Sequence, residues 1–575
     1  MQYIRIIIIL ICLCTFVNAK AQLNTNEKPV SFDRESELAV ISRSSIPIVT
    51  TPKLDMEKIA KEDEEDELYD MPPRFGYSHF VNYDLNNCGT WFELPNGDKL
   101  WQLEVVCPGA LSVNFCYDKF WVPEGGKFFV YSKDRKHTIG AFTSRNNKGD
   151  RENIRGFATG LIYGDNVVLE YYQPKEVTAD AIISIAKVVH GYRYIRINDG
   201  YGLSDTCMVN INCEAGQDWQ YEKKAVAMIV VDGNRWCTGS LINTTDLSQK
   251  PYMLTANHCL GGEANHGIKY DAVGLPNLDH FTFYWDYEEP DCNNSGVEPS
   301  LNKCTHGAIV VANQYGTSGE KTDFALLRLT DDPKNLTGYR PFYLGWDRSG
   351  QSGNPGVCIH HPRGDVKKIS TILSQPTSST FDQYYTSLSY WKVFFSHGVV
   401  NGGSSGSALL NDAHRIIGQL RSSETENCNY NGQSLYGKFD LSWTGNGIDT
   451  DSIHRRLDCW LDSLNTEEQT MEGLLVLSTT KTITTNEQLH IYSNILIKSP
   501  GQLVIEGDLE LKGNCRVIVE SGGSLFIDGG KLSNADVVLK SGATFEITEG
   551  GILETRKGFE ASVGAVVYIE EGKII

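Results

Sequence analysis

The pattern of apolar and polar positions from residue 71 onward is that of β-strands. Runs rich in β-branched and aromatic residues, at 100–106, 128–131 and 166–172, lie between Gly and Pro turn signals. Two further runs, 251–259 and 323–329, are mostly apolar, which is typical of buried strands. The pattern therefore predicts a mainly β protein.

A periodic pattern begins near residue 497. A Gly followed by alternating apolar residues recurs about every 20 residues, at Gly501, Gly523, Gly542 and Gly564. Regular turns and short strands at such a period predict a stacked β-repeat, or β-solenoid, module. Its pattern contains no catalytic grouping. Attachment to a cell surface, spacing from that surface and export all remain open as its role.

Two stretches depart from the β pattern. Residues 22–70 are polar and end in the acidic run 57–70, which predicts a solvated linker or a short helix. Residues 451–462 are amphipathic and predict a helix. Arg455 and Arg456 in this helix are interpreted as structural residues.

The chain of 575 residues is too long for one hydrophobic core. We predict five segments: a signal peptide at 1–21, an acidic polar linker at 22–70, a β-rich domain at 71–201, a second β-domain at 202–465 and the repeat module at 466–575.

The first 21 residues predict export from the cell. They contain one Arg, an apolar run from Ile6 to Val17 and small residues at Ala19 and Ala21. This is the pattern of a secretory signal and is too short to span a membrane. We expect a secreted protein, extracellular or at the cell surface, without a transmembrane segment.

Net charge bears on the partners. A formal charge of −20 and an isoelectric point near 5.1 make the chain a poor partner for nucleic acid. The sequence also has no basic stripe that would favour binding to nucleic acid. His360 and His361 suggest a metal pair, but neighbours in a strand point to opposite faces, so a structural role is favoured. We predict no metal and no cofactor.

Three residues could together perform acyl transfer. Ser405 lies in N-G-G-S-S-G-S, where glycines permit a tight turn with two N–H groups aimed at one oxygen. His258 ends one mostly apolar run, and Asp323 opens another. A shielded Asp can fix the tautomer of a His that serves as the base for a Ser. Alone, the 401–410 stretch could equally be a flexible Gly/Ser loop.

These motifs carry a resemblance. T-A-N-H-C, D-F-A-L-L and G-S-S-G-S, supported by C-T-G-S-L-I-N-T and G-W-D-R, resemble the chymotrypsin-fold serine endopeptidases and most of all the bacterial lysyl endopeptidases. The likeness runs from about residue 202 to 462. It implies a double β-barrel in which Ser405 is the nucleophile, His258 the general base and Asp323 its orienting partner. The backbone N–H groups of Gly403 and Ser405 would form the oxyanion hole.

Cysteines in an exported chain are expected to form disulfides. The resemblance implies three pairs: Cys207 with Cys428, Cys213 with Cys292, and Cys237 with Cys259. The last pair closes a loop of about 20 residues beside His258, worth roughly 3 kcal/mol. Two more pairs are considered, Cys304 with Cys358 and Cys107 with Cys116. An odd number of cysteines remains after the signal segment, so at least one is free or bonded between chains.

The segment before residue 202 resembles the propeptide of the same family at 87–97 and 108–115. A prodomain would assist folding or cover the active site, and an accessory binding sandwich is the alternative. Tyr201 replaces a Lys at the maturation junction. Ser404 replaces the Asp of trypsin-like zymogens, so removal of the prodomain is the expected route of activation.

The specificity pocket departs from the family. Lysyl endopeptidases place an Asp two residues before Tyr-Gly, and Ser434 occupies that position here. The trypsin-like position is Val399, and a family His is replaced by Arg421, which could face the pocket or solvent. Asp440 is a further candidate. Without an Asp, a buried Lys side chain would be unpaired, so Lys specificity does not carry over.

Two functions remain open. The favoured one is a secreted serine endopeptidase, made as a zymogen, that acts on protein or peptide substrates. The alternative is a protease-fold binding or adhesion protein of the cell surface without peptidase activity, attached through the C-terminal module.

Overall fold

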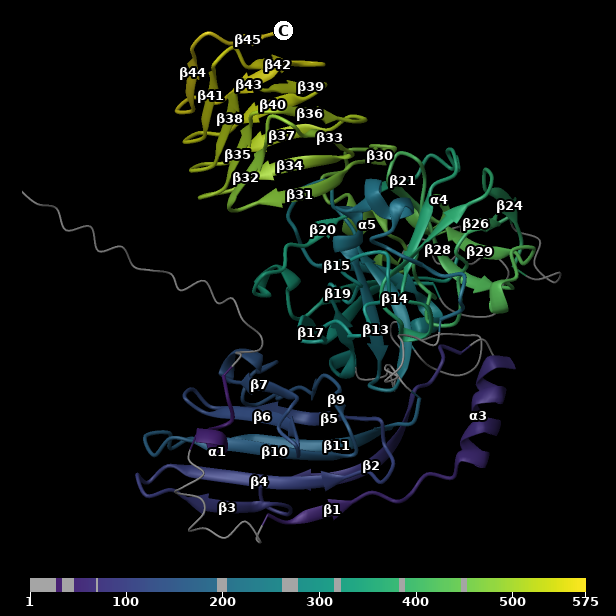
Figure 1. Ribbon diagram of the computed structural model, residues 1–575, viewed down its shortest axis with the longest axis vertical. Coiled ribbons are helices and arrows are strands. Elements are labelled where there is room, and N and C mark those ends of the chain that lie inside the picture. The colour runs from purple at the N-terminus through teal and green to yellow at the C-terminus, as the bar shows by residue number, and fades with distance from the viewer. Residues whose placement is uncertain are drawn as a thin grey trace, which may run out of the picture.

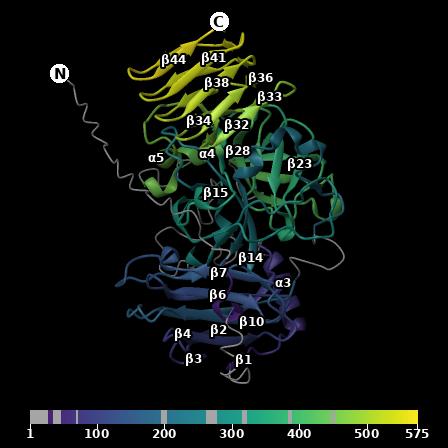
Figure 2. The ribbon, with the colours of Figure 1, turned by 60° about the vertical axis from the view of Figure 1, so that its left-hand side comes forward.

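The computed structural model describes eight stretches of the chain: 27–33, 46–68, 71–193, 204–260, 278–314, 322–381, 388–445 and 452–575. The predicted signal segment and the Tyr201–Gly202 junction lie outside them. The described residues form three β-rich regions that follow one another along the long axis (Figure 1, Figure 2). The prediction of a mainly β fold is confirmed.

The N-terminal region consists of two packed sheets. One has the order β1-β4-β10-β6-β7 with β3 on β4, and the other has the order β2-β11-β5-β8 with β9 on β5. Their facing side chains form an aromatic-rich core that includes Trp101, Phe115, Tyr117 and Phe128. The strands are β1 (Ile48–Thr50), β2 (Gly76–Asp84), β3 (Thr90–Glu93), β4 (Lys99–Val106), β5 (Ser112–Trp121), β6 (Lys127–Ser132), β7 (Thr138–Phe142), β8 (Phe157–Ala158), β9 (Ile162–Tyr163), β10 (Asn166–Gln173) and β11 (Ile182–Gly191).

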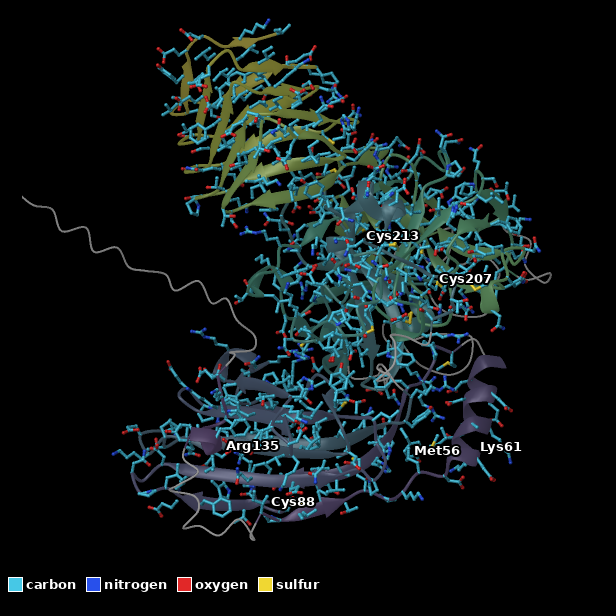
Figure 3. The ribbon with its side chains drawn as sticks, viewed as in Figure 1. Met56, Lys61, Cys88, Arg135, Cys207 and Cys213 are labelled. Carbon is cyan, nitrogen blue, oxygen red and sulfur yellow. A yellow bond between two sulfur atoms is a disulfide. The ribbon has the colours of Figure 1, made fainter. Side chains whose placement is uncertain are left out.

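Two helices accompany this region. The acidic run forms α3 (Met56–Leu68), and a single turn, α1 (Val30–Asp33), precedes it. Figure 3 shows Met56 and Lys61 on α3 beside the N-terminal sheets. Asp63 of α3 is buried, and its carboxylate forms ion pairs with Arg74 at 2.9 Å and with Arg193 at 2.8 Å. The acidic run is thus a helix docked by ion pairs.

The central region contains a seven-stranded sheet and an eleven-stranded sheet. The first has the order β17-β16-β13-β14-β15-β19-β18, and the second has the path β12-β23-β22-β27-β28-β29-β25-β24 with β21, β26 and β30 beside it. One large core joins them. The first sheet comprises β13 (Val226–Val231), β14 (Arg235–Leu241), β15 (Tyr252–Ala256), β16 (Thr282–Tyr284), β17 (Cys304–His306), β18 (Ala308–Asn313) and β19 (Phe324–Leu329). The second comprises β12 (Val209–Asn210), β21 (Gly345–Asp347), β22 (Val357–His360), β23 (Lys368–Ile372), β24 (Thr377–Ser379), β25 (Tyr390–Val393), β26 (Phe395–His397), β27 (Ala408–Leu410), β28 (Arg415–Ser423), β29 (Ser434–Lys438) and β30 (Thr470–Met471).

The amphipathic stretch near 451–462 does not form one continuous helix. A 3-10 turn at Ile453–Arg455 precedes the short helix α5 (Asp458–Leu461), and α4 (Phe439–Thr444) lies upstream. Leu457 and Leu461 are nevertheless buried. Tertiary contacts of Arg455, which donates to the backbone oxygen of Asn313 at 3.0 Å, fix the first turn in place.

The C-terminal region is a parallel β-solenoid with three faces. Its sheets have the orders β31-β34-β37-β40-β43, β32-β35-β38-β41-β44 and β33-β36-β39-β42-β45, and β20 (Phe342–Tyr343) of the central region joins the first. Each strand pairs in parallel with its counterpart in the next turn. A Cβ at Gly523 would lie 2.7 Å from the Ile497 oxygen, so this turn requires glycine. The predicted repeat is confirmed. Its strands are β31 (Gly473–Leu477), β32 (Thr480–Ile483), β33 (Gln488–Ile491), β34 (Ser493–Ile497), β35 (Gln502–Ile505), β36 (Asp508–Leu511), β37 (Arg516–Val519), β38 (Ser524–Asp528), β39 (Lys531–Ser533), β40 (Asp536–Leu539), β41 (Thr544–Thr548), β42 (Ile552–Glu554), β43 (Phe559–Ala561), β44 (Val566–Ile569) and β45 (Lys573–Ile574).

Disulfides join the three pairs that the resemblance implied: Cys207–Cys428, Cys213–Cys292 and Cys237–Cys259. Cys207 and Cys213 lie near the start of the central region (Figure 3).

The two other pairings were wrong. Cys304 and Cys358 lie in different sheets, β17 and β22, and both are free thiols. The Cys358 Sγ lies 3.1 Å from the Ser407 hydroxyl. Cys107 follows β4 and Cys116 lies in β5, strands of the two opposed sheets of the N-terminal region, and both are also free. Within the described stretches, no helix is long and apolar enough to cross a membrane.

Candidate active site

Ser405 lies in the loop before β27, between strands of the two central sheets. Its carbonyl accepts a hydrogen bond from the Thr238 N–H of β14 at 2.8 Å. On the other side, the next residue, Gly406, donates its N–H to the Leu420 oxygen of β28 at 3.0 Å. The loop is therefore held from both sides, and Ser405 itself stays partly exposed.

His258 and Asp323 meet because β15 and β19 are neighbours. The register pairs Ala256 with Phe324, which places the turn after β15 beside the residue before β19. The Nδ1 of His258 lies 2.7 Å from the Asp323 Oδ2, and the His258 backbone N–H donates to Oδ1 at 3.1 Å. Asp323 is 8% exposed. Its carboxylate therefore fixes the tautomer of the imidazole with a proton on Nδ1.

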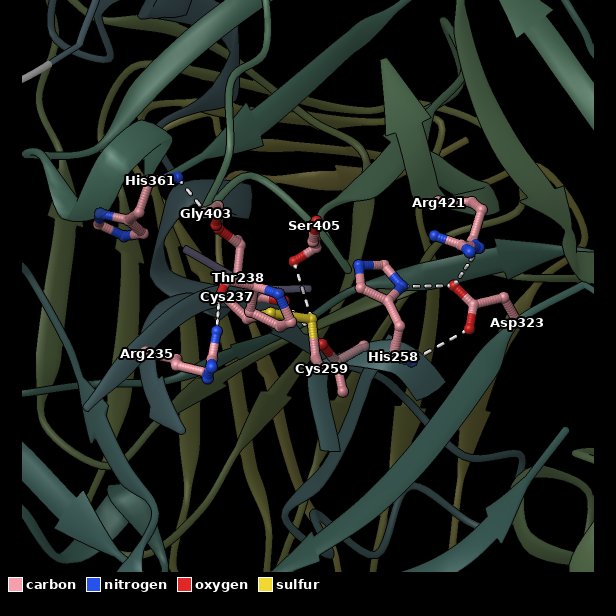
Figure 4. The surroundings of a disulfide bond; sticks show 12 residues. Arg235, Cys237, Thr238, His258, Cys259, Asp323, His361, Gly403, Ser405 and Arg421 are labelled. Carbon is pink, nitrogen blue, oxygen red and sulfur yellow. Dashed lines mark hydrogen bonds and ion pairs between the residues drawn. A yellow bond between two sulfur atoms is a disulfide. The ribbon is translucent and has the colours of Figure 1, made fainter. Parts of the chain in front are cut away.

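The second ring nitrogen of His258 points toward Ser405. Figure 4 shows the imidazole between Asp323 and Ser405, with Nδ1 on the Asp323 side. The Nε2 is buried and has no hydrogen-bond partner within the described residues. With Nδ1 protonated, Nε2 carries the lone pair, so it can accept a proton from the Ser405 side.

The disulfide Cys237–Cys259 fixes this geometry. It spans 22 residues and ties β14 to the turn that carries His258. The Cys259 Sγ lies 3.5 Å from the Ser405 carbonyl oxygen (Figure 4). One covalent link therefore fixes the base against the loop of the nucleophile.

Gly403 and Ser405 provide two backbone N–H groups on one turn. Gly403 has a φ of +91°, and its carbonyl accepts from the Thr238 hydroxyl at 2.9 Å. A Cβ at position 403 would lie 2.9 Å from the Arg363 nitrogen, so the turn requires glycine. Among the described residues, neither N–H is paired with an acceptor. Such a pair is suited to bind a developing oxyanion.

A chain of neutral hydrogen bonds anchors Ser404. Its hydroxyl accepts from the Asn401 N–H at 3.1 Å and lies 2.8 Å from His360 Nδ1. The His360 Nε2 lies 2.9 Å from the Ser370 hydroxyl, which donates to the Val399 oxygen at 2.8 Å. Burial lowers the pKa of His360 to about 3, so its ring is neutral. The loop is thus held without the ion pair that an Asp at 404 would provide.

The hydrogen bonds of His360 explain why the two adjacent histidines do not share a metal ion. The Nδ1 of His361 lies 2.9 Å from the Asp365 carbonyl oxygen, on the opposite side of the strand from His360. Burial also lowers the pKa of His361. Within the described residues no group of three His, Cys, Asp or Glu side chains is arranged to hold a metal ion.

Comparisons with known proteins show what the central region is similar to. Residues 201–439 match the family described as "Lysyl endopeptidase, C-terminal domain". The central region is therefore similar to this domain of the lysyl endopeptidases. The Lysyl endopeptidase of Pseudomonas aeruginosa is 29% identical over 287 residues, which cover 46% of this chain and 56% of that protein. The chain thus spans about half the length of this curated relative.

Solved structures give more distant matches. A serine endoprotease from Yersinia pestis matches with 17% identity and a TM-score of 0.25, over 40% of this chain and 63% of that one. A Glu endopeptidase matches with 16% identity and a TM-score of 0.24, over 38% of this chain and 85% of that one.

In the central region, Arg421 contacts the Asp of the site and does not face solvent. Its Nε lies 3.5 Å from the Asp323 Oδ2, and its guanidinium lies 4.5 Å from the Phe381 ring centroid. The side chain is almost fully buried. A cation at this distance stabilises the carboxylate. This burial contradicts the alternative that Arg421 faces solvent, and its assignment to the specificity pocket stays a prediction.

Hydroxyl groups surround the predicted specificity residues. Ser434 on β29 is opposite Ser423 on β28, and their hydroxyls lie 2.7 Å apart. Thr425 lies 2.7 Å from Ser423 and donates to the Val400 oxygen at 2.6 Å. Val399 is fully buried next to this group. Asp440 is elsewhere: one of its carboxylate oxygens would lie 3.0 Å from a Cβ at Gly350.

The roles of some site residues were not predicted from the sequence. Thr238 holds both Gly403 and Ser405, although the C-T-G-S motif that contains it was noted only for the resemblance. Asp205 accepts from the Asn401 side chain at 3.1 Å and from the Cys428 N–H at 3.2 Å. No local sequence pattern around either residue predicts its hydrogen-bond partners, because these partners are far away in the sequence.

Proposed function

We propose that this protein is a secreted serine endopeptidase that hydrolyses peptide bonds through an acyl-enzyme on Ser405. The 2.7 Å contact of His258 Nδ1 with Asp323, with Nε2 turned toward Ser405, carries the proposal. Disulfides support an oxidising, extracellular location. The proposed substrate is a protein or peptide.

The reaction follows from the residue geometry. His258 Nε2 accepts the Ser405 hydroxyl proton as Ser405 Oγ attacks the peptide carbonyl, and the N–H groups of Gly403 and Ser405 bind the oxyanion. His258 then gives this proton to the leaving amine. Water hydrolyses the acyl-enzyme with His258 again acting as base. Asp323, with Arg421 beside it, stabilises the imidazolium.

The substrate residue before the scissile bond is proposed to be uncharged. Lys specificity would require a carboxylate in the pocket, and the Ser423–Ser434 pair offers two hydroxyls instead. An unpaired buried ammonium would cost several kcal/mol. The Lys specificity that gives the matched family its name is therefore not proposed for this chain.

Labelling of the secreted protein with a fluorophosphonate probe tests the proposal. The probe should modify the wild-type chain but not Ser405→Ala, with circular dichroism showing that both are folded. Ser407→Ala is the matched control, because this hydroxyl contacts Cys358 and not the triad, and it should still be labelled. No labelling of a folded wild-type chain, with or without the N-terminal region, would favour the binding-protein alternative.

A further inference from the structure

The hairpin of β27 and β28 carries the nucleophile loop at its open end. Ser405 lies shortly before β27, and the backbone of Leu420 on β28 holds the residues that follow it. The Leu420 oxygen accepts from the Gly406 N–H at 3.0 Å, and the Leu420 N–H donates to the Ser407 oxygen at 2.9 Å. A movement of β28 is therefore passed directly to the loop of Ser405.

The same strand also reaches the aspartate of the site. The side-chain amide of Gln419 donates to the Thr322 carbonyl oxygen at 2.5 Å, and the Arg421 Nε lies 3.5 Å from the Asp323 Oδ2. Gln419 and Arg421 are both buried. Together with Leu420 between them, they make β28 a common support for the nucleophile loop and for Asp323.

The other end of the hairpin is held less completely by its own sheet. We call residues 411–417 the hairpin tip. Among the described strand pairs, β22 pairs with β27 before the tip, and β29 pairs with β28 only from Gly418 onward. β21 reaches the tip at Arg415 and Ile416. The position of the tip therefore depends on contacts from outside this sheet as well.

The solenoid supplies one such contact by ring stacking. The His414 ring lies between Trp219 of the central region and Tyr492, which connects β33 to β34 of the solenoid. The ring centroids are 3.8 Å and 3.9 Å apart, with interplanar angles of 13° and 5°. The His414 Nδ1 also lies 2.8 Å from the Glu222 Oε1. His414 is buried with a φ of +61°, where glycine would be relaxed, so the chain keeps an imidazole at a strained position.

An ion pair adds a second contact beside the first. Arg415 binds Glu472 with two nitrogens, Nε at 3.0 Å from Oε2 and Nη2 at 2.5 Å from Oε1. Glu472 lies between β30 and β31, and its Oε1 also accepts from the Asn514 N–H of the solenoid at 2.9 Å. Its backbone oxygen accepts from the Asn243 side chain at 2.9 Å. Glu472 therefore joins the hairpin tip, the central region and the solenoid at one point.

We propose that the solenoid is a positioning element of the endopeptidase site and that His414 and Arg415 transmit its support through the β27–β28 hairpin. This inference rests on the proposed function and gives the C-terminal region a role in it. While the tip is clamped, Leu420 and Arg421 keep the positions that hold Ser405 and Asp323. When the clamp is lost, the hairpin shifts, and even a small displacement of a nucleophile slows its attack.

Tyr492→Ala in the full-length chain tests the proposal, because it removes the solenoid ring of the stack at a partly exposed position far from Ser405 in the sequence. The extent of fluorophosphonate labelling counts the competent sites, and its rate constant reports on the nucleophile. Hydrolysis of p-nitrophenyl acetate gives kcat per labelled site and KM. Tyr492→Phe keeps the ring. His490→Ala, at a 55% exposed side chain on β33, is the matched control.

Tyr492→Ala should lower kcat per labelled site and the labelling rate constant about tenfold, with KM unchanged, because a shifted hairpin alters the geometry of attack and not binding. Tyr492→Phe should restore both values. His490→Ala should leave them unchanged, as should Phe545→Ala, which acts on the distant strand β41.

Two results would overturn the inference. One is a wild-type kcat per labelled site in Tyr492→Ala, even if fewer sites are labelled, since this would mean that the stack affects stability alone. The other is a loss that Tyr492→Phe does not restore. No labelling of the folded wild-type chain would instead contradict the proposed function.

Discussion

The central and C-terminal regions are both built from β-strands but differ in how their strands are paired. In the solenoid, β35 pairs with β38 and β38 with β41, always in parallel and always with the next turn. In the central region, β13 pairs with the adjacent β14 and also with the more distant β16, and β22 pairs with β23 and also with the more distant β27. Nearest-neighbour stacking makes a repeated surface, whereas long-range pairing brings distant loops to one point.

The two cores reflect this difference. The solenoid interior is a column of aliphatic and aromatic side chains such as Leu525, Ile527 and Phe545, all fully buried. The central region instead buries His258, Asp323 and His360 and holds each of them with hydrogen bonds, while the His258 Nε2 has no partner within the described residues. Buried polar groups need specific partners. The central region therefore concentrates function at one place, while the solenoid distributes stability along its length.

The largest expected effect is a loss of catalysis from one central substitution. Asp323→Asn should lower kcat by about 10⁴-fold, because an amide cannot hold the His258 tautomer with Nε2 free. Peptide hydrolysis measures this. Asp528→Asn in the solenoid is the matched control, since Asp528 accepts only from the Thr548 hydroxyl among the described hydrogen bonds, and hydrolysis should be unchanged. An Asp323→Asn protein with wild-type kcat would contradict the proposed triad.

The second prediction concerns the solenoid. Phe545→Ala removes a fully buried ring and should cost about 3–5 kcal/mol, because a cavity forms in the column. Hydrogen exchange should show the loss in the turns next to β41, with peptide hydrolysis retained. Phe526→Ala on the outer face of β38 is the control and should have a much smaller effect. A parallel loss of hydrolysis would show that the two regions are not independent.

The smallest expected effect is a difference in acid sensitivity. Burial lowers the pKa of both His306 and His360 to about 3. Unfolded histidines titrate near 6.5, so between pH 6.5 and 3 the unfolded state binds protons that the native state does not. As the pH is lowered through this range, the free energy of unfolding of the central region should decrease by about 1.4 kcal/mol per pH unit for each histidine.

The solenoid has no matching liability in this range. Residues 466–575 contain a single histidine, His490, whose side chain is 55% exposed. The pKa of Asp536 is lowered by hydrogen bonds and by Arg556, so its contribution is lost only below the ordinary carboxyl range near pH 4. Hydrogen exchange from pH 7 to 4.5 should show the central region loosening first. Earlier loosening of the solenoid would contradict this.

The sequence by itself determined whatever depends on local pattern. The glycine period was enough to predict the solenoid, because each turn pairs only with the turns next to it. The T-A-N-H-C, D-F-A-L-L and G-S-S-G-S motifs led to His258, Asp323 and Ser405, which the structure brings together at the junction of two sheets. Three cysteine pairs followed from the same resemblance.

Only the tertiary structure decided which distant groups meet. Arg421 contacts Asp323, Cys304 and Cys358 stay apart in different sheets, and Pro73 lies on Gly402. None of these relations leaves a periodic or local signal, because each depends on the register and packing of strands far apart in the chain. The sequence gives the type of each side chain, whereas the fold determines which distant side chains it contacts.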